Sequence, residues 1–187
     1  TAPYLIDELF NIHSEKLSDY VNLLPVKPWY RFLFDNNEYL DYGENLRGTV
    51  REIKTKYGKD NAKSYIKLLK HSKRIFNKAF MELSDEPFES LGSMVKHLPE
   101  LLRIRFDRSV YKAVDKHIGN IHLNQALSMH PLLVGGNPYS TTSIYLLIQY
   151  LEWKWGVFYA EGGTGKIVEA LEKLLINKGV EIRKNTE

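Results

Sequence analysis

The residues with the clearest potential for chemistry form a glycine-rich turn late in the sequence. The turn consists of Gly162, Gly163, Thr164 and Gly165. An aromatic strand is expected before it, over residues 156–160, and a helix after it, over residues 166–177. Glycines at such a turn let the backbone approach a ligand closely, and the first amides of a helix favour an anion. The pattern is neither the dinucleotide G-x-G-x-x-G motif nor a Walker loop. A plain tight turn is therefore an equal alternative.

Side chains suited to acid–base or metal chemistry are scattered. His117 and His122 are five residues apart and do not form the i, i+4 pair of a helical zinc site, so no metal site is predicted. His130 precedes a glycine turn and could face a tunnel and handle a proton, although a packed histidine is the commoner outcome. Lys96 is the other acid–base candidate. The chain has no cysteine, which excludes disulfides and cysteine nucleophiles.

Composition indicates one globular domain over residues 1–187. The net charge is +3 and 43% of the residues are hydrophobic, which are ordinary values for a globular chain. The longest apolar run, residues 144–148, is far shorter than the ~20 residues of a membrane span, and no signal-peptide pattern opens the sequence. We therefore expect a cytoplasmic protein whose membrane contact, if any, is peripheral.

Periodicity and turn residues predict an α+β fold that is mostly helical. A β-hairpin is expected from strands over residues 29–34 and 38–42. Helices are expected at the start of the chain, through Val21, and over residues 46–57, 60–83, 108–118, 121–129 and 140–155, with a break at Gly58. A final strand over 180–183 would complete a strand-helix-strand edge, residues 156–187, which needs a sheet to join.

An interfacial surface is expected in residues 91–105, where apolar and basic side chains alternate. Its members are Met94, Leu98, Leu101, Leu102, Arg103, Ile104 and Arg105. Such a pattern suits a helix lying in a bilayer interface, and it also suits an ordinary core helix. Basic residues also cluster over 54–78 and could meet phosphate, although a solvated helix face is the simpler interpretation. No cluster of base-reading side chains accompanies them, so nucleic acid is not an expected partner.

Several blocks of the sequence, taken in order, resemble the flavin-dependent carotenoid desaturases of the phytoene desaturase family. They lie at residues 24–26, 29–31, 108–111, 132–138, 143–145, 155–157 and 163–165. The resemblance implies FAD chemistry and a long isoprenoid hydrocarbon substrate, with hydride transfer to the flavin. The family's flavin fingerprint is missing from this sequence. We therefore expect the substrate-binding, membrane-facing fragment of a larger flavoenzyme, which does not hold FAD tightly by itself.

The resemblance also implies roles for individual residues. The flavin contact falls to the turn at residues 162–165. The substrate would meet Trp29, Tyr30, Phe32, His130, Gly135, Gly136, Asn137, Pro138, Tyr139, Tyr145, Trp155 and Phe158. Each aromatic among them could equally be a core residue. Two alternatives stay open: a related carotenoid or retinoid isomerase or amine-oxidase-like enzyme, and a non-catalytic helical module that binds nucleic acid through residues 54–78.

Overall fold

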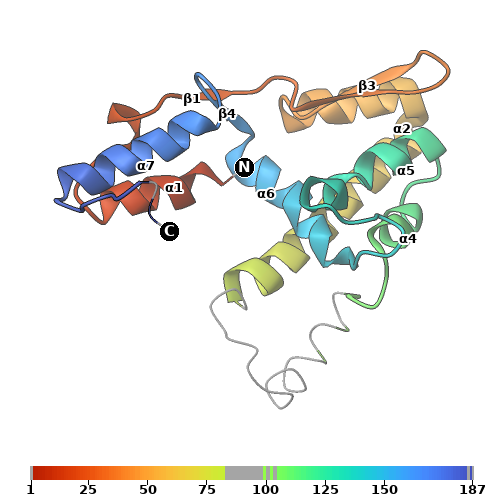
Figure 1. The fold of residues 1–187 in the computed structure, drawn as a ribbon. Helices are drawn as coiled ribbons and strands as arrows, with labels where there is room; N and C mark the ends of the chain where they lie inside the picture. Colours follow the sequence, from red (N-terminus) through yellow and green to blue (C-terminus); the bar gives the residue numbers. More distant parts are fainter. Residues whose placement is uncertain (1, 83–98, 100–101, 103–104, 185, 187) are drawn as a thin grey trace. The chain divides into compact units, whose positions relative to one another are not determined.

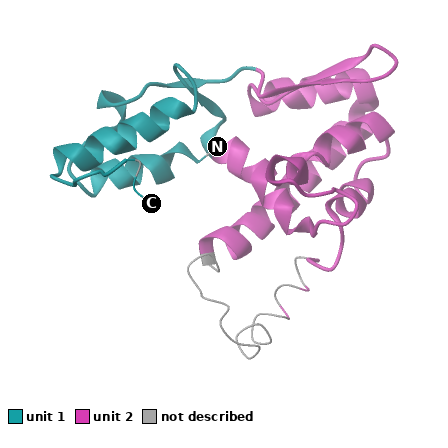
Figure 2. Cartoon of the chain, in the orientation of Figure 1, with its two compact units in different colours: residues 1–27, 155–187 teal, residues 28–154 magenta. Residues whose placement is uncertain are grey.

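The chain folds as a mostly helical α+β protein with two small antiparallel strand pairs, which confirms the expected fold class (Figure 1). The computed structural model describes residues 2–82, 99, 102, 105–184 and 186. The chain divides into two compact units, coloured separately in Figure 2. Unit 1 comprises residues 1–27 and 155–187, and unit 2 comprises residues 28–154.

Unit 1 is built from two chain segments that are far apart in the sequence. The helix α1 (Pro3–Asn11) and the strand β1 (Leu23–Pro25) come from the first segment. The strand β4 (Phe158–Ala160) and the helix α7 (Gly165–Asn177) come from the second. β1 and β4 pair antiparallel, with Leu23 opposite Ala160. A small core joins the four elements and contains Phe10, Leu17, Val21, Ala160, Ala170 and Leu174.

Two expectations for unit 1 are corrected by the structure. Residues 180–183 form no strand, because Val180 and Ile182 are largely exposed and a strand needs a hydrogen-bonded partner. β4 instead pairs with β1, whose sequence Leu-Leu-Pro is too short to show alternation. The first helix ends at Asn11 rather than continuing through Val21, and Leu17 lies in a separate 3₁₀ turn.

Unit 2 opens with the predicted hairpin. β2 (Tyr30–Leu33) pairs antiparallel with β3 (Tyr39–Tyr42), and the register places Tyr30 opposite Tyr42. Asn37 adopts a positive φ of 60° in the connecting turn, a conformation that asparagine tolerates well. Alternation then directs one face of the hairpin, including Leu40 and Tyr42, into the core.

The helices of unit 2 cover that face. α2 (Leu46–Ile75) is capped by the Asn45 side chain, which accepts the Gly48 amide at 2.7 Å, and it is broken at Gly58 as predicted. It continues as a π-helix over Phe76–Glu82. The shorter helices α4 (Val110–Asp115), α5 (Ile121–Leu127) and α6 (Leu147–Trp155) follow. Their apolar faces form one core with the hairpin, which includes Leu40, Tyr42, Ile53, Tyr65, Leu68, Ile75, Val114, Leu123, Leu127 and Leu146.

Candidate functional site

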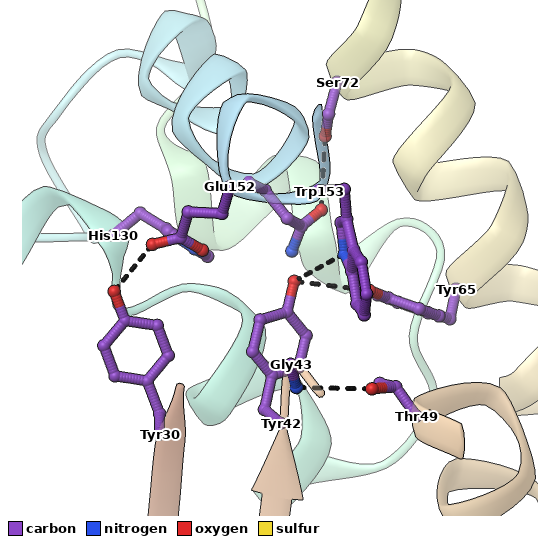
Figure 3. Close-up of polar contacts among 10 residues, drawn as sticks. Tyr30, Tyr42, Gly43, Thr49, Tyr65, Ser72, His130, Glu152 and Trp153 are labelled. Carbon is purple, nitrogen blue, oxygen red and sulfur yellow. Dashed lines mark hydrogen bonds and ion pairs between the residues drawn. The ribbon is translucent and has the colours of Figure 1, made fainter. Parts of the chain in front are cut away.

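A buried carboxylate joins three elements of unit 2. Glu152 lies on α6 with none of its side chain exposed, and Tyr30 on β2 donates a hydrogen bond of 2.6 Å to Glu152 Oε1. His130 Nε2 lies 3.1 Å from Glu152 Oε2, and its side chain is 1% exposed. His130 begins a 3₁₀ helix, His130–Val134 (Figure 3). The structure thus brings together two residues named from the sequence, Tyr30 and His130, around an acid that was not named.

Glu152 shares its helix face with a second buried polar residue, Gln149. Ser72 Oγ on α2 lies 3.2 Å from Gln149 Oε1. Two polar atoms of this region have no hydrogen-bond partner in the described part of the chain: His130 Nδ1 and Gln149 Nε2. The polar pair at i and i+3, within a mostly apolar helix, was the sequence signal that could have found this site, because that spacing places both residues on one face.

A second polar network lies beside the first. Trp153 Nε1 points to Tyr65 Oη at 2.7 Å and to Tyr42 Oη at 3.1 Å, and the two hydroxyls are 3.2 Å apart. The Trp29 ring packs at 4.5 Å from the Trp153 ring. Figure 3 shows the Tyr42, Tyr65 and Trp153 side chains converging between the hairpin, α2 and α6. Trp29 is therefore part of the packing of unit 2.

These phenols are held in their protonated form. Burial raises the pKa of Tyr42 and Tyr65 well above the ordinary value. The pKa of Tyr30 is raised by burial first, then by the negative charge of Glu152 and by the hydrogen bond to it. A hydroxyl whose ionised form is disfavoured acts as a donor and not as a base. The arrangement therefore fixes β2, α6 and the 3₁₀ helix at one point, and contact of Tyr30 and His130 with substrate stays a prediction.

The accessible surface near this network is an apolar loop, which we define as residues 132–139. It begins within the 3₁₀ helix His130–Val134 and lines a cavity of about 590 Å³. Leu132 and Val134 are 61% and 57% exposed. The cavity's lining residues are Leu132, Gly135, Gly136, Asn137, Pro138 and Tyr139. Five of the twelve substrate residues named from the sequence thus line one cavity.

Backbone hydrogen bonds give the apolar loop a defined shape. The Gly136 amide donates to the Pro131 carbonyl at 2.8 Å, and the Tyr139 amide donates to Asn137 Oδ1 at 2.9 Å. The Pro138 carbonyl accepts the Tyr111 amide at 3.0 Å, which ties the loop to α4. An exposed apolar surface held in this way is available to an apolar ligand.

The remaining substrate residues named from the sequence lie in different surroundings. Phe32 and Tyr145 are half-buried against the core of unit 2. Trp155 and Phe158 belong to unit 1, where Trp155 stacks on Tyr4 with ring centroids 4.5 Å apart. Their contact with substrate stays a prediction.

The glycine-rich turn connects β4 to α7, as the sequence predicts. Gly162 and Gly163 have φ values of +82° and +99°, which only glycine adopts readily. The amides of Gly163, Lys166 and Ile167 donate to carbonyls of the same turn, and the Lys166 side chain lies against Gly162. The backbone conformation of the turn thus explains why glycines occupy it. Contact between this turn and FAD stays a prediction, and no catalytic step is assigned to it.

Most of the predicted interfacial residues lie outside the described residues, as does the acid–base candidate Lys96. This applies to Met94, Leu98, Leu101, Arg103 and Ile104. The other two are described. Leu102 is 48% exposed, and Arg105 forms two 3.1 Å hydrogen bonds with Asp107.

Within the described parts of the chain, no helix combines the length and the apolar character that crossing a bilayer requires. Nor do three or more histidine or acidic side chains gather there as a possible metal-ligand set.

Comparison with known proteins gives the class to which the chain corresponds: it is homologous to the carotenoid desaturases. Within that class its relatives are phytoene desaturases, which confirms the resemblance seen in the sequence. No protein-family model matches the chain.

Three relatives show the extent of the similarity. The lycopene-forming phytoene desaturase of Pseudescherichia vulneris is 40% identical over 185 residues, 99% of this chain and 37% of the relative. The lycopene-forming enzyme of Pantoea ananas is 37% identical over 182 residues, 97% of this chain and 37% of the relative. The neurosporene-forming enzyme of Rhodobacter capsulatus is 33% identical over 188 residues, 100% of this chain and 36% of the relative. The chain thus spans little more than a third of the length of these relatives.

Proposed function

We propose that this chain is the substrate-handling part of an FAD-dependent oxidoreductase that desaturates a carotenoid precursor such as phytoene. The observation that carries the proposal is similarity along the whole chain to proteins named phytoene desaturases. It extends over both units, so the helical unit and the apolar loop correspond to segments of those enzymes.

The apolar loop is the surface that we assign to the hydrocarbon. A polyene precursor offers no hydrogen-bond partner, so its affinity must come from burial of apolar area at about 25 cal/mol per Å². Leu132, Leu133 and Val134 are each more than half exposed and remain available for such burial. The loop's cavity is open enough to admit a chain from solvent or from a bilayer surface.

The buried network supports this surface from behind. His130, which contacts Glu152, is the first residue of the 3₁₀ helix that leads into the apolar loop. Fixing its ring against Glu152 and Tyr30 fixes where the loop begins. We assign Glu152, His130 and Tyr30 a positioning role, because their contacts hold the loop's origin and the side chains of Glu152 and His130 are buried.

We infer that most of the flavin site lies in parts of the enzyme that correspond to the rest of the relatives' length. The 187-residue chain mixed with FAD should then retain little flavin after gel filtration. Tight, stoichiometric binding of flavin by this chain alone would contradict the inference that most of the flavin site lies elsewhere in the enzyme.

Peripheral membrane contact through residues 91–105 is part of the same proposal, since a water-insoluble substrate must come from a bilayer. Sedimentation with anionic liposomes tests it. Binding by the parent chain should weaken in the variant Leu101→Asp with Leu102→Asp, and a parent chain that leaves the liposomes in the supernatant would contradict it.

A chimera tests the proposed reaction. This chain would replace the matching 182-residue segment of the Pantoea ananas enzyme, and conversion of phytoene would be measured in bacteria that accumulate it. Desaturated, coloured product is the expected result. A chimera that folds and holds FAD but leaves phytoene unchanged would overturn the proposal.

Substitutions within the chimera test the role of the apolar loop. Leu132→Asp with Val134→Asp should lower conversion severalfold, because charges would then line the hydrocarbon surface. Ile121→Asp is the matched control: Ile121 is 61% exposed, lies outside the loop, and opens α5, where an acid is favourable. Equal losses in the two variants would argue against a substrate role for the loop.

A further inference from the structure

A basic pocket in unit 2 has an anion-binding character that carotenoid desaturation does not use. Its volume is about 390 Å³. One wall is a single face of α2, where Lys67, Lys70, His71 and Arg74 follow the i, i+3, i+4, i+7 spacing of one helical stripe. The sequence pattern favours one solvated helix face for the basic residues over 54–78. In the structure, four of them line a common cavity instead.

The opposite wall comes from both sides of α4. Arg105 and Arg108 precede that helix, while Lys116 and His117 follow it. Among the described lining residues of the pocket, only Ala113 is not basic. The pocket is therefore assembled from segments that are 30 or more positions apart in the chain, and its floor is kept open by a small side chain.

The charges in this pocket are poorly compensated. None of its described lining residues is acidic. Arg105 pairs with Asp107, while the described residues provide no ion pair to Lys67, Arg74 or Arg108. Cations gathered without counter-charges repel one another and cost stability unless an anion joins them.

Two histidines lie within this group of positive charges, and the charges lower their pKa values further than burial alone. The His71 and His117 rings lie 6.3 Å apart. The pKa of His71 is lowered by burial first, then by His117, Arg74, Lys116 and Arg108. The pKa of His117 is lowered by burial, then by Lys116 and Lys67. Both rings are neutral at pH 7, and both gain a proton more easily once an anion offsets the surrounding charge.

We propose that this pocket binds a phosphate group, as a phosphomonoester or phosphodiester, between the α2 face and the segments flanking α4. Three arginines, whose planar forks match phosphate oxygens, lie among lysines that supply point charge, which is the usual composition of a phosphate site. The phosphate can be that of a free metabolite or that of an anionic lipid headgroup. The two sources make the same contacts in the pocket and differ in what is attached to the phosphate.

Histidine NMR on the 187-residue chain gives a site-specific test with inorganic phosphate and pyrophosphate as probes. The ring signals of His71 and His117 should shift saturably, and their pKa values should rise toward the ordinary value. His13 and His122 lie outside the pocket and should not respond. Absence of a shift, or equal shifts at all histidines, would overturn the proposal.

Charge-matched variants separate the pocket from overall charge. Arg74→Gln with Arg108→Gln should weaken pyrophosphate binding by about tenfold or more, since two charge-assisted contacts are lost. Lys54→Gln with Lys59→Gln removes the same charge from exposed positions of α2 outside the pocket and should change affinity less than about twofold. Equal losses in both variants would refute the site.

Folding of each variant is checked by circular dichroism. If the arginine variant does not fold, Lys67→Gln with Lys116→Gln, at two exposed lining positions, makes the same comparison. Retained affinity in that second variant would overturn the proposal.

Vesicles distinguish the two sources of phosphate. The probes are phosphatidylcholine vesicles with and without phosphatidic acid. Sedimentation that requires phosphatidic acid, is lost in the arginine variant and is competed by pyrophosphate would assign a lipid headgroup. Pyrophosphate binding without vesicle binding would assign a soluble phosphate compound. Vesicle binding that is insensitive to the pocket variants, with no response to pyrophosphate, would refute the proposal.

Discussion

Glu152 is the residue on which a half-buried tyrosine and a buried histidine depend. Its Oε1 accepts a hydrogen bond of 2.6 Å from the Tyr30 hydroxyl, and its Oε2 lies 3.1 Å from His130 Nε2. Glu152→Leu would leave both partners without an acceptor in a buried site, and we expect a loss of about 3–5 kcal/mol in the free energy of unfolding. Glu152→Gln keeps an acceptor for Tyr30 and should cost about 1–2 kcal/mol. Urea denaturation measures both.

A double-mutant cycle checks the mechanism behind this prediction. Tyr30→Phe combined with Glu152→Leu should be less destabilising than the sum of the two single changes, since both remove the same hydrogen bond. Strict additivity would show that the 2.6 Å contact contributes nothing to stability.

The buried phenols predict an alkaline limit to stability. The pKa values of Tyr30, Tyr42 and Tyr65 are raised in the fold, chiefly by burial. Their contribution is therefore complete below the unfolded value of about 10, and it falls as the pH rises above that value because the unfolded chain releases protons first. Urea midpoints should drop above that pH, and tyrosinate absorbance should show these three phenols ionising only together with unfolding. Ionisation of all tyrosines near pH 10 in a folded chain would contradict this.

At the scale of elements, the junction between β3 and α2 depends on one glycine. Gly43 has a φ of +85°, and a Cβ added there would lie 2.0 Å from the Trp29 ring. Its amide donates to Thr49 Oγ1 at 3.3 Å. Gly43→Ala therefore combines backbone strain with a clash against a packed indole, and we expect a loss of about 2–4 kcal/mol together with a change in tryptophan fluorescence.

Gly119→Ala is the matched control for that substitution. A Cβ at Gly119 would meet nothing within 4 Å, so the change should stay within about 0.5 kcal/mol. If Gly43→Ala were as mild as the control, Trp29 would have to be free to move away from the junction.

Sequence patterns predicted the elements whose structure is determined by residues close together in the sequence. The hairpin follows from alternation and its Asn-rich turn, and the break at Gly58 follows from glycine itself. The pairing of β1 with β4 was not predicted, because it joins Leu23 to Ala160 through contacts that leave no periodic trace in either segment. In the candidate site, too, the part with local causes was predicted and the part made by long-range contacts was not. The apolar loop follows from its turn residues, whereas the link between Glu152 and Tyr30 spans 122 positions and exists only in the fold.

At the scale of the whole molecule, each unit has its own core. Phe10 is fully buried in the core of unit 1, and Phe10→Ala should destabilise that unit by about 3–5 kcal/mol. Amide hydrogen exchange should accelerate at Ala160 and Leu174 and remain slow at Leu68, which belongs to the other core. Uniform acceleration at all three positions would show that the chain unfolds as one cooperative body.

Because unit 1 is built from two separate segments, it cannot complete its fold until the second segment has been translated. The strand β1 emerges early, yet its partner β4 is synthesised only after all of residues 28–154, a delay on the order of ten seconds at ordinary elongation rates. Throughout that interval Phe10, Leu17 and Val21 have no completed core to enter. The first of the two segments of unit 1 thus waits for its partner in the nascent chain, where a chaperone would protect it, and the helical insert can finish folding before it.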